Sequence, residues 1–104
     1  MTKLDPLYYR IYEFKGLIEA RKGNFVPALK NLEYAKKLAY TLQEKGSITY
    51  SFANYYALKG EKQRAISLLQ NITEACLCKK KVLAEDEDLK SLRDIPAFQE
   101  ILAK

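Results

Sequence analysis

The sequence contains no histidine and no tryptophan, and its two cysteines are Cys76 and Cys78. Without histidine there is no imidazole to act as a general base or to activate a nucleophile, and no glycine-rich phosphate loop is present. The two thiols fall two positions apart in an expected helix, where side chains point about 200° apart, so they are poorly placed to share a metal ion. We therefore expect no enzyme, no metal and no cofactor.

Glycine and proline are scarce, with four and three residues in 104, which leaves little material for the turns of an all-β fold. No apolar run approaches the roughly 18 to 20 residues of a membrane span, and the first residues lack the apolar core of a secretory signal. Two isolated cysteines are typical of small buried side chains in a reducing compartment. These features predict a single all-α domain over residues 1–104, in the cytoplasm, with no membrane segment.

Charge is unevenly distributed along the chain. The formal net charge is +5, yet residues 82–104 hold six acidic and three basic side chains, so the basic excess lies in residues 1–81. A basic body with an acidic end could attract nucleic acid or an acidic partner. The same distribution is also that of an ordinary solvated helical surface, and this second interpretation is favoured.

What the sequence does have is an internal repeat. Aligning Gly23 with Gly60, at an offset of 37 residues, brings small and apolar positions into coincidence, as a helical repeat requires. The matching pairs are Gly16 with Ala53, Ala28 with Ala65, Leu32 with Leu69, and Ala35 with Ile72. Each aligned glycine is able to adopt φ > 0 and so to end a helix at a tight turn. Because such short turns join antiparallel neighbours, the pattern predicts two antiparallel helical hairpins.

The expected hairpins cover about residues 6–45 and 47–79, and capping helices cover about residues 86–103. Gly46 should end the second helix, and Ser47 should cap the third. The link between residue 79 and the acidic cluster is expected to be irregular.

Local signals support the individual helices. Asp5 and Pro6 suit the start of the first helix, and Asn24 is a candidate cap for the second. Helical spacing then assigns core positions. For the first helix these are Leu7, Ile11, Phe14 and Ile18, and the stripe of the second helix runs from Phe25 to Leu42.

These residues resemble the tetratricopeptide repeat family, whose helix pairs stack into an α-α superhelix. The resemblance is carried by Gly16, Gly23, Phe25, Ala28, Leu32 and Ala35 in the first repeat, and by Ala53, Tyr56, Gly60, Ala65 and Leu69 in the second. The end of the chain is similar to the D-L-x-x-L-R-x-x-P-x-F-x-x-L-L segment that follows the last repeat in many bacterial proteins of this type. The matching residues are Asp88, Leu89, Leu92, Arg93, Pro96, Phe98, Ile101 and Leu102. This second resemblance implies a structural cap, in which Asp88 and Arg93 hold a turn.

The resemblance also implies a function. In this family the first helices of successive repeats line a concave groove that holds a peptide or a partner helix, so we expect a non-enzymatic scaffold for protein–protein interaction. Carried over to this sequence, the groove wall consists of Arg10, Glu13, Leu17, Arg21, Tyr50, Asn54 and Ala57. An Arg–Tyr–Asn surface suits an extended or acidic segment, because Arg pairs with carboxylates and Asn bonds to peptide backbone. The same residues are also compatible with plain solvated helix edges.

Two further kinds of partner are compatible with the sequence. Self-association through an open N-terminal face is an expectation of a short repeat protein. Eight tyrosines and a charge of +5 make nucleic acid the alternative partner, since aromatic rings stack on bases and cations pair with phosphates. Against it, Tyr12, Tyr34, Tyr55 and Tyr56 fall at or near core positions, and no nucleic-acid motif is present. Another protein or peptide remains the favoured partner.

Overall fold

The computed structural model describes residues 8–74 and 80–103. The sequence-based expectations for Asp5, Pro6, Leu7, Cys76 and Cys78 lie outside these residues. Every secondary-structure element of the described part is a helix, which confirms the all-α prediction. The elements are α1 (Tyr8–Arg21), α2 (Phe25–Leu38), α3 (Leu42–Lys59), α4 (Lys62–Glu74), α5 (Lys80–Glu85), the 3₁₀ helix η1 (Glu87–Leu92) and α6 (Pro96–Ala103).

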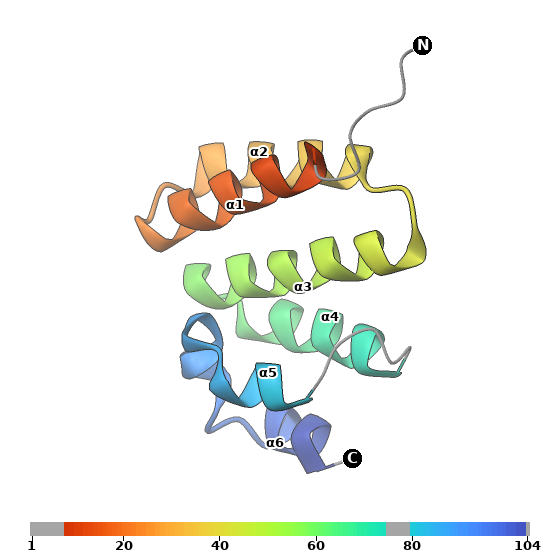
Figure 1. The fold of residues 1–104 in the computed structure, drawn as a ribbon. Helices are drawn as coiled ribbons and strands as arrows, with labels where there is room; N and C mark the ends of the chain where they lie inside the picture. The colour runs from red at the N-terminus through yellow and green to blue at the C-terminus, as the bar shows by residue number, and fades with distance from the viewer. Residues whose placement is uncertain (1–7, 75–79, 104) are drawn as a thin grey trace.

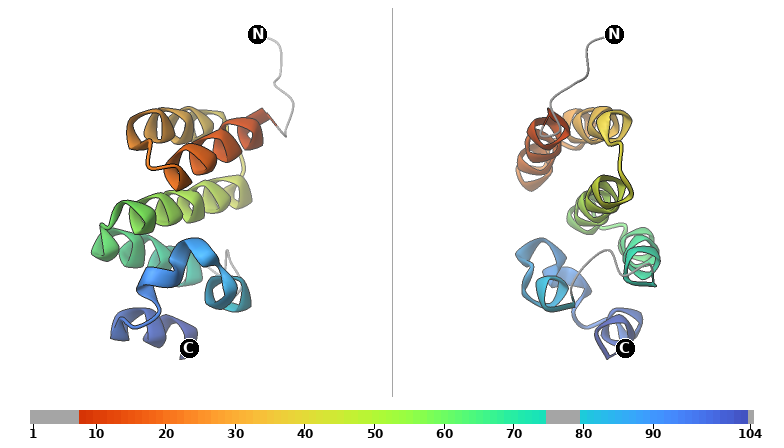
Figure 2. Two further views of the ribbon diagram at one scale, coloured as in Figure 1. Left: turned by 90° about the vertical axis from the view of Figure 1, so that its left-hand side faces the viewer. Right: turned by 45° about the vertical axis from the view of Figure 1, so that its right-hand side comes forward.

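The helices follow one another in space as they do in the chain. Figure 1 shows α1 and α2 as one pair, α3 and α4 as the next pair below it, and α5 to α6 beyond them. The two further views in Figure 2 show the same succession from one end of the molecule to the other. Gly23 and Gly60 turn the chain within each pair, with φ of 87° and 96°. This is the left-handed conformation that glycine adopts without strain, so both predicted turns are confirmed.

The small residues and the leucines that match at the 37-residue offset are buried alike. Ala28 and Ala65 are both fully buried, as are Leu32 and Leu69. Gly16 and Ala53 are buried where the first helix of each pair approaches its neighbour. Small side chains at these places let the helix backbones come close, since a larger group would separate them. The repeat in the sequence is therefore a repeat in packing.

The prediction for the inner face of the first helix was wrong. Ile11, Phe14 and Ile18, which were expected in the core, are 50%, 52% and 48% exposed. The buried side of α1 is instead formed by Tyr9, Glu13, Gly16, Leu17 and Ala20. Helical spacing fits either side of this helix, and the small residues decide between them, because only the side with Gly16 and Ala20 admits α2 at close range.

The boundary between the hairpins also differs from the prediction. Helix α2 ends at Leu38, and α3 already begins at Leu42, so that Gly46 and Ser47 lie inside α3. The cause is a capping box at the start of α3. The Thr41 hydroxyl accepts a hydrogen bond from the Glu44 backbone N–H, and the Glu44 carboxylate accepts a hydrogen bond from the Thr41 backbone N–H. Asn24 precedes α2, but its side chain makes no capping hydrogen bond.

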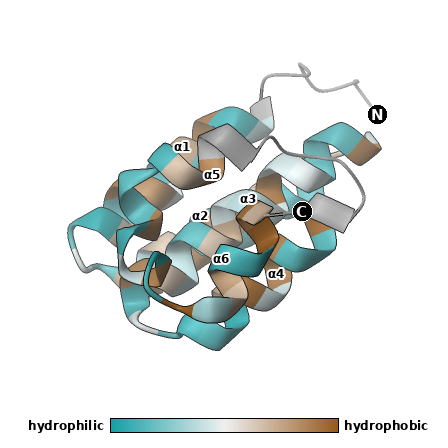
Figure 3. Ribbon diagram, turned by 90° about the horizontal axis from the view of Figure 1, so that it is seen from below, coloured by the Kyte–Doolittle hydropathy of each residue, from teal (hydrophilic) through white to brown (hydrophobic). Residues whose placement is uncertain are grey.

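The C-terminal segment packs on the second pair, as a cap would. Leu83, Leu89, Leu92, Phe98 and Ile101 are buried and share one apolar cluster with residues of α3 and α4. In Figure 3 hydrophobic and hydrophilic stretches alternate along the helices, as is typical of amphipathic elements. The expected irregular link is in part the short helix α5. The burial of Phe98 and Ile101 agrees with the structural cap that the resemblance of this segment implies.

Candidate functional site

The seven residues predicted to line the groove all lie on α1 and α3, but they differ in how far they are buried. Arg10 and Arg21 are exposed, and Tyr50 is half-buried. The other four are buried within the chain, with exposed fractions of 3% for Glu13, 8% for Leu17, 3% for Asn54 and 4% for Ala57. Part of the predicted wall is therefore covered by the protein itself.

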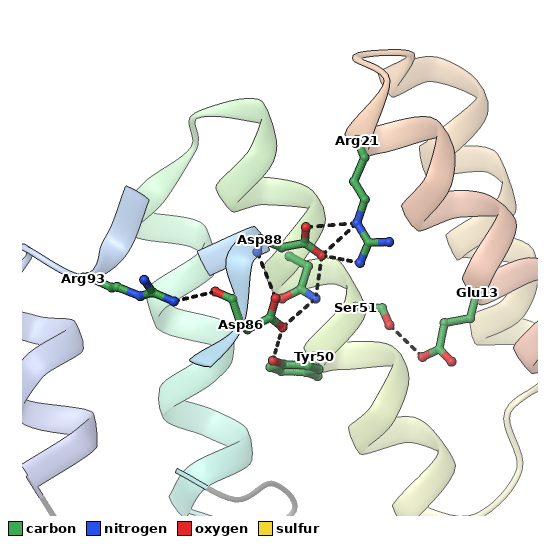
Figure 4. Close-up of polar contacts among 8 residues, drawn as sticks. Glu13, Arg21, Tyr50, Ser51, Asp86, Asp88 and Arg93 are labelled. Carbon is green, nitrogen blue, oxygen red and sulfur yellow. Dashed lines mark hydrogen bonds and ion pairs between the residues drawn. The ribbon is translucent and has the colours of Figure 1, made fainter. Parts of the chain in front are cut away.

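The segment that covers it is acidic and comes from the C-terminal part of the chain. Arg21, in the last turn of α1, forms a two-pronged ion pair with Asp88 at the start of η1. Its Nε donates to Asp88 Oδ1 at 3.0 Å, and its Nη2 donates to Asp88 Oδ2 at 2.7 Å. Asp88 is 7% exposed, whereas the Arg21 side chain is 54% exposed. Figure 4 shows this pair bridging α1 and the C-terminal segment.

Two side chains of α3 hold the same segment. Tyr50 Oη donates to Asp86 Oδ2, as Figure 4 shows. Asn54 Nδ2 donates to Asp86 Oδ2 at 3.3 Å and lies 3.5 Å from Asp88 Oδ2. The amide of Asn54 thus turns its donor toward both carboxylates, while its Oδ1 is buried without a hydrogen-bond partner. This orientation is the one that carboxylate binding requires.

Asp86 also organises its own backbone. Its Oδ1 accepts from the Asp88 N–H at 2.9 Å, which caps η1, and its carbonyl accepts from Arg93 Nη2 at 3.3 Å. Leu83 and Leu89, on either side of the acidic residues, are fully buried. Apolar anchors therefore fix the segment at both ends, and the carboxylates fix its orientation. The expected turn-holding role of Arg93 is supported by this contact.

A second polar contact joins α1 to α3. Glu13 Oε2 accepts from Ser51 Oγ at 2.6 Å and from Ser47 Oγ at 3.0 Å. Since an unpaired buried carboxylate is costly, these two hydroxyls are what allow Glu13 to remain inside. In the structure, the Glu13 carboxylate therefore binds hydroxyls of its own chain and does not face an open groove.

The electrostatics of the site centre on Arg21. Its hydrogen bond to Asp88 raises the pKa of the guanidinium above its usual value, and the charges of Asp88 and Asp86 add to this against the opposing effect of burial. Across residues 8–74 and 80–103, no cluster of three or more Cys, Asp or Glu side chains is placed to hold a metal ion. Within the chain, these contacts bind the carboxylates of Asp86 and Asp88.

Sequence reasoning missed Asp86 as a member of this site and assigned Asp88 to a local turn. The available signal was charge: a run of four acidic residues, Glu85 to Asp88, follows a basic pair of hairpins. Opposite charges on distant segments suggest contact, but they do not say which cation meets which carboxylate.

A separate cleft opens between α2, α3 and α4. Its volume is about 630 Å³, and its floor is largely apolar. The lining residues are Leu29, Glu33, Lys36, Lys45, Ile48, Thr49, Phe52, Tyr56 and Leu68. None of the predicted groove residues belongs to it.

No family model, curated protein or solved structure matches this chain. None of the helices in the described ranges has the length and apolar character needed to cross a bilayer.

Proposed function

We propose that this chain is a non-enzymatic protein-interaction scaffold whose α1–α3 face binds an extended acidic segment of a partner. The proposal keeps the tetratricopeptide-like interpretation of the two hairpins and the expected cytoplasmic location. The single observation that carries it is the convergence of Arg21, Tyr50 and Asn54, from two helices, on the two carboxylates of Asp86 and Asp88.

Convergence of this kind is chemically selective. A guanidinium offers two parallel N–H donors that match a carboxylate, and an amide and a phenol add donors from a second helix. The three groups contact Asp86 and Asp88, two residues apart on one short stretch of backbone. A partner segment with two carboxylates at the same spacing presents the same pattern.

In this interpretation the segment around Asp86 and Asp88 is a resident ligand. An external segment must compete with it, and its apparent affinity equals its intrinsic affinity multiplied by the fraction of molecules in which the carboxylate positions are free. Removal of the two carboxylates should weaken the hold of the resident segment on Arg21, Tyr50 and Asn54, so that an external segment can displace it, while the other buried side chains of the cap, such as Leu92 and Phe98, keep the cap folded.

The test is a titration of a labelled peptide with the sequence of residues 84–93 against the full chain, followed by fluorescence anisotropy. The parent protein should bind it weakly. The double variant Asp86→Ala, Asp88→Ala, which removes both charge and bulk, should bind it at least tenfold more tightly. Adding Arg21→Ala to that variant should abolish the gain. Lys22→Ala, one residue further on and paired with Glu19, is the matched control and should leave binding unchanged.

A second peptide with asparagine at both aspartate positions separates charge recognition from general stickiness, and it should bind at least tenfold more weakly than the acidic one. Circular dichroism establishes that each variant is folded at the temperature of the titration. Equal affinity of the parent and the double alanine variant, with both folded, would show that the contacts only close the cap, and the proposal would be wrong.

A further inference from the structure

The outer side of α1 carries an uncovered apolar stripe. Ile11, Phe14 and Ile18 are each about half exposed, at 50%, 52% and 48%, and their i, i+3, i+7 spacing aligns them on one side of the helix. The stripe lies away from the carboxylate site, because the opposite side of α1 holds Glu13 and Leu17 against the protein. Large apolar side chains gathered on one exposed line are a feature of interaction surfaces.

The equivalent positions of α3 show what kind of element covers such a stripe. At the 37-residue offset, Ile11 corresponds to Ile48 and Ile18 to Tyr55, and these residues of α3 are only 1% and 2% exposed. Ile48 packs with Tyr9, Ala35 and Ala39 of the first pair and its following turn. Tyr55 clusters with residues of α1 and α2, and its hydroxyl reaches the Phe25 carbonyl. In the second pair these positions are thus covered by the preceding helices, whereas the equivalent positions in the first pair are exposed to solvent.

The charges beside the stripe indicate the chemistry of the occupant. Arg10, Lys15 and Lys22 are exposed on α1 and its end, and Glu19 is the carboxylate among them that reaches Lys22, at 3.9 Å. Arg10 and Lys15 contact the rings of Tyr9 and Tyr12 and pair with no carboxylate of the described part of the chain. The border of the stripe is therefore cationic.

We propose that Ile11, Phe14 and Ile18 form a second docking surface, which receives an amphipathic helix of a partner protein with acidic residues bordering its apolar stripe. The helical form follows from the covered equivalents in α3, and the acidic border follows from Arg10, Lys15 and Lys22. A second copy fits less well, because a symmetric contact would bring the same cations against one another.

The probe is a synthetic amphipathic helix of about 18 residues, long enough to extend beyond the stripe, with leucines at i, i+3 and i+7 and glutamates on both borders. A matched peptide carries lysines in place of the glutamates. The full chain should bind the glutamate peptide at least tenfold more tightly than the lysine peptide. The double variant Phe14→Ser, Ile18→Ser should lose at least tenfold of that affinity, and Ile18→Ser alone should lose part of it.

Val26→Ser is the control, since Val26 is a 70% exposed apolar residue of α2 outside the stripe, and it should bind like the parent. Equal binding of both peptides, or equal binding by the parent and the serine variants, would overturn the proposal. Sedimentation of the parent at two concentrations tests whether a second copy of the chain occupies the stripe instead. If the parent formed a dimer and the serine variants did not, the stripe would be the contact between two copies of this chain, and the proposal of a partner helix would be overturned.

Discussion

Gly16 of α1 faces Leu32 of α2 so closely that a methyl group at Gly16 would stand 2.7 Å from Leu32 Cγ and 3.0 Å from the Ala28 carbonyl oxygen. A Cβ atom essentially never lies as close as 2.7 Å to another carbon, and a contact of 3.0 Å is tighter than most. The carbonyl belongs to the backbone of α2, which cannot move aside alone. The absence of a side chain at residue 16 therefore sets how closely the first two helices pack.

Gly16→Ala should destabilise the fold. Overpacking a close helix contact costs about 1–3 kcal/mol, which exceeds the roughly 1 kcal/mol that alanine gains over glycine in a helix interior. We expect the free energy of unfolding to fall by about 1 kcal/mol, measured by urea unfolding followed by circular dichroism.

Lys15→Ala, on the exposed side of the same helix, is the control and should leave the unfolding midpoint nearly unchanged. A Gly16→Ala variant as stable as the parent would mean that α1 and α2 have room to separate and that Gly16 does not set their distance.

The sequence predicted the all-α fold and both glycine turns, because small and apolar residues that recur at a 37-residue offset are typical of paired helices. It could not predict the rotation of α1. Ile11, Phe14 and Ile18 look like a core stripe in isolation, and only the contact between Gly16 and Leu32 shows which side α2 approaches. The start of α3 was predictable, since Thr41 and Glu44 have the spacing of a capping box.

For the candidate site, the sequence predicted residue types suited to carboxylates but not that the chain supplies the carboxylates itself. Arg21 and Asp88 are 67 positions apart, and local patterns carry no information about such a pair. Whether Arg21, Tyr50 and Asn54 also bind an external segment stays a prediction. The apolar stripe was visible as a pattern, but only the burial of its equivalents Ile48 and Tyr55 gives it meaning.

The ion pair of Arg21 with Asp88 should stabilise the cap measurably. In a double-mutant cycle with Arg21→Ala and Asp88→Ala, we expect a coupling free energy of about 1–2 kcal/mol. This coupling free energy is larger than that of a usual surface ion pair because Asp88 is nearly buried. It is smaller than that of a fully buried pair because the Arg21 side chain is half exposed. Thermal unfolding of the parent, both single variants and the double variant gives the coupling.

Salt provides the check on the origin of that coupling. Raising the ionic strength from about 0.1 M to 1 M shortens the Debye length from about 10 Å to about 3 Å and should reduce the coupling. The control cycle uses Lys22 and Glu19, an exposed pair at 3.9 Å, which should couple by less than the Arg21 pair. A coupling near zero for Arg21 and Asp88 would mean that the leucine anchors alone hold the segment.

Phe98→Ala should be the most destabilising single change in the cap. The ring is fully buried in the cluster that joins α6 to the second helix pair, and removing such a ring costs about 3–5 kcal/mol. Thermal unfolding should show a large drop in melting temperature. Glu100→Ala, on the exposed side of α6, should melt like the parent. An unchanged melting curve for Phe98→Ala would contradict the assignment of residues 80–103 as a cap.

The capping box at the start of α3 makes stability depend on pH. The Glu44 carboxylate accepts a hydrogen bond from the Thr41 backbone N–H at 3.0 Å and one from the Tyr40 backbone N–H at 2.7 Å. Both hydrogen bonds lower the pKa of the Glu44 carboxyl, and the bond from Thr41 contributes most. A carboxyl whose pKa is lower in the folded chain stabilises the fold above its unfolded pKa. That contribution is lost as the pH falls through the folded pKa.

Thermal unfolding between pH 7 and pH 3 should therefore show the parent slightly more stable than Glu44→Gln at neutral pH, because the amide oxygen accepts the same hydrogen bonds without the charge. The two should converge as the pH falls through the folded pKa of Glu44, which lies below that of a free glutamate. Thr41→Ala removes the other half of the box and should cost about 1 kcal/mol at neutral pH. Glu33→Gln, an exposed carboxylate of α2, should track the parent at every pH. A difference in stability between parent and Glu44→Gln that stayed constant from pH 7 to pH 3 would mean that the stabilisation does not come from the charged carboxylate.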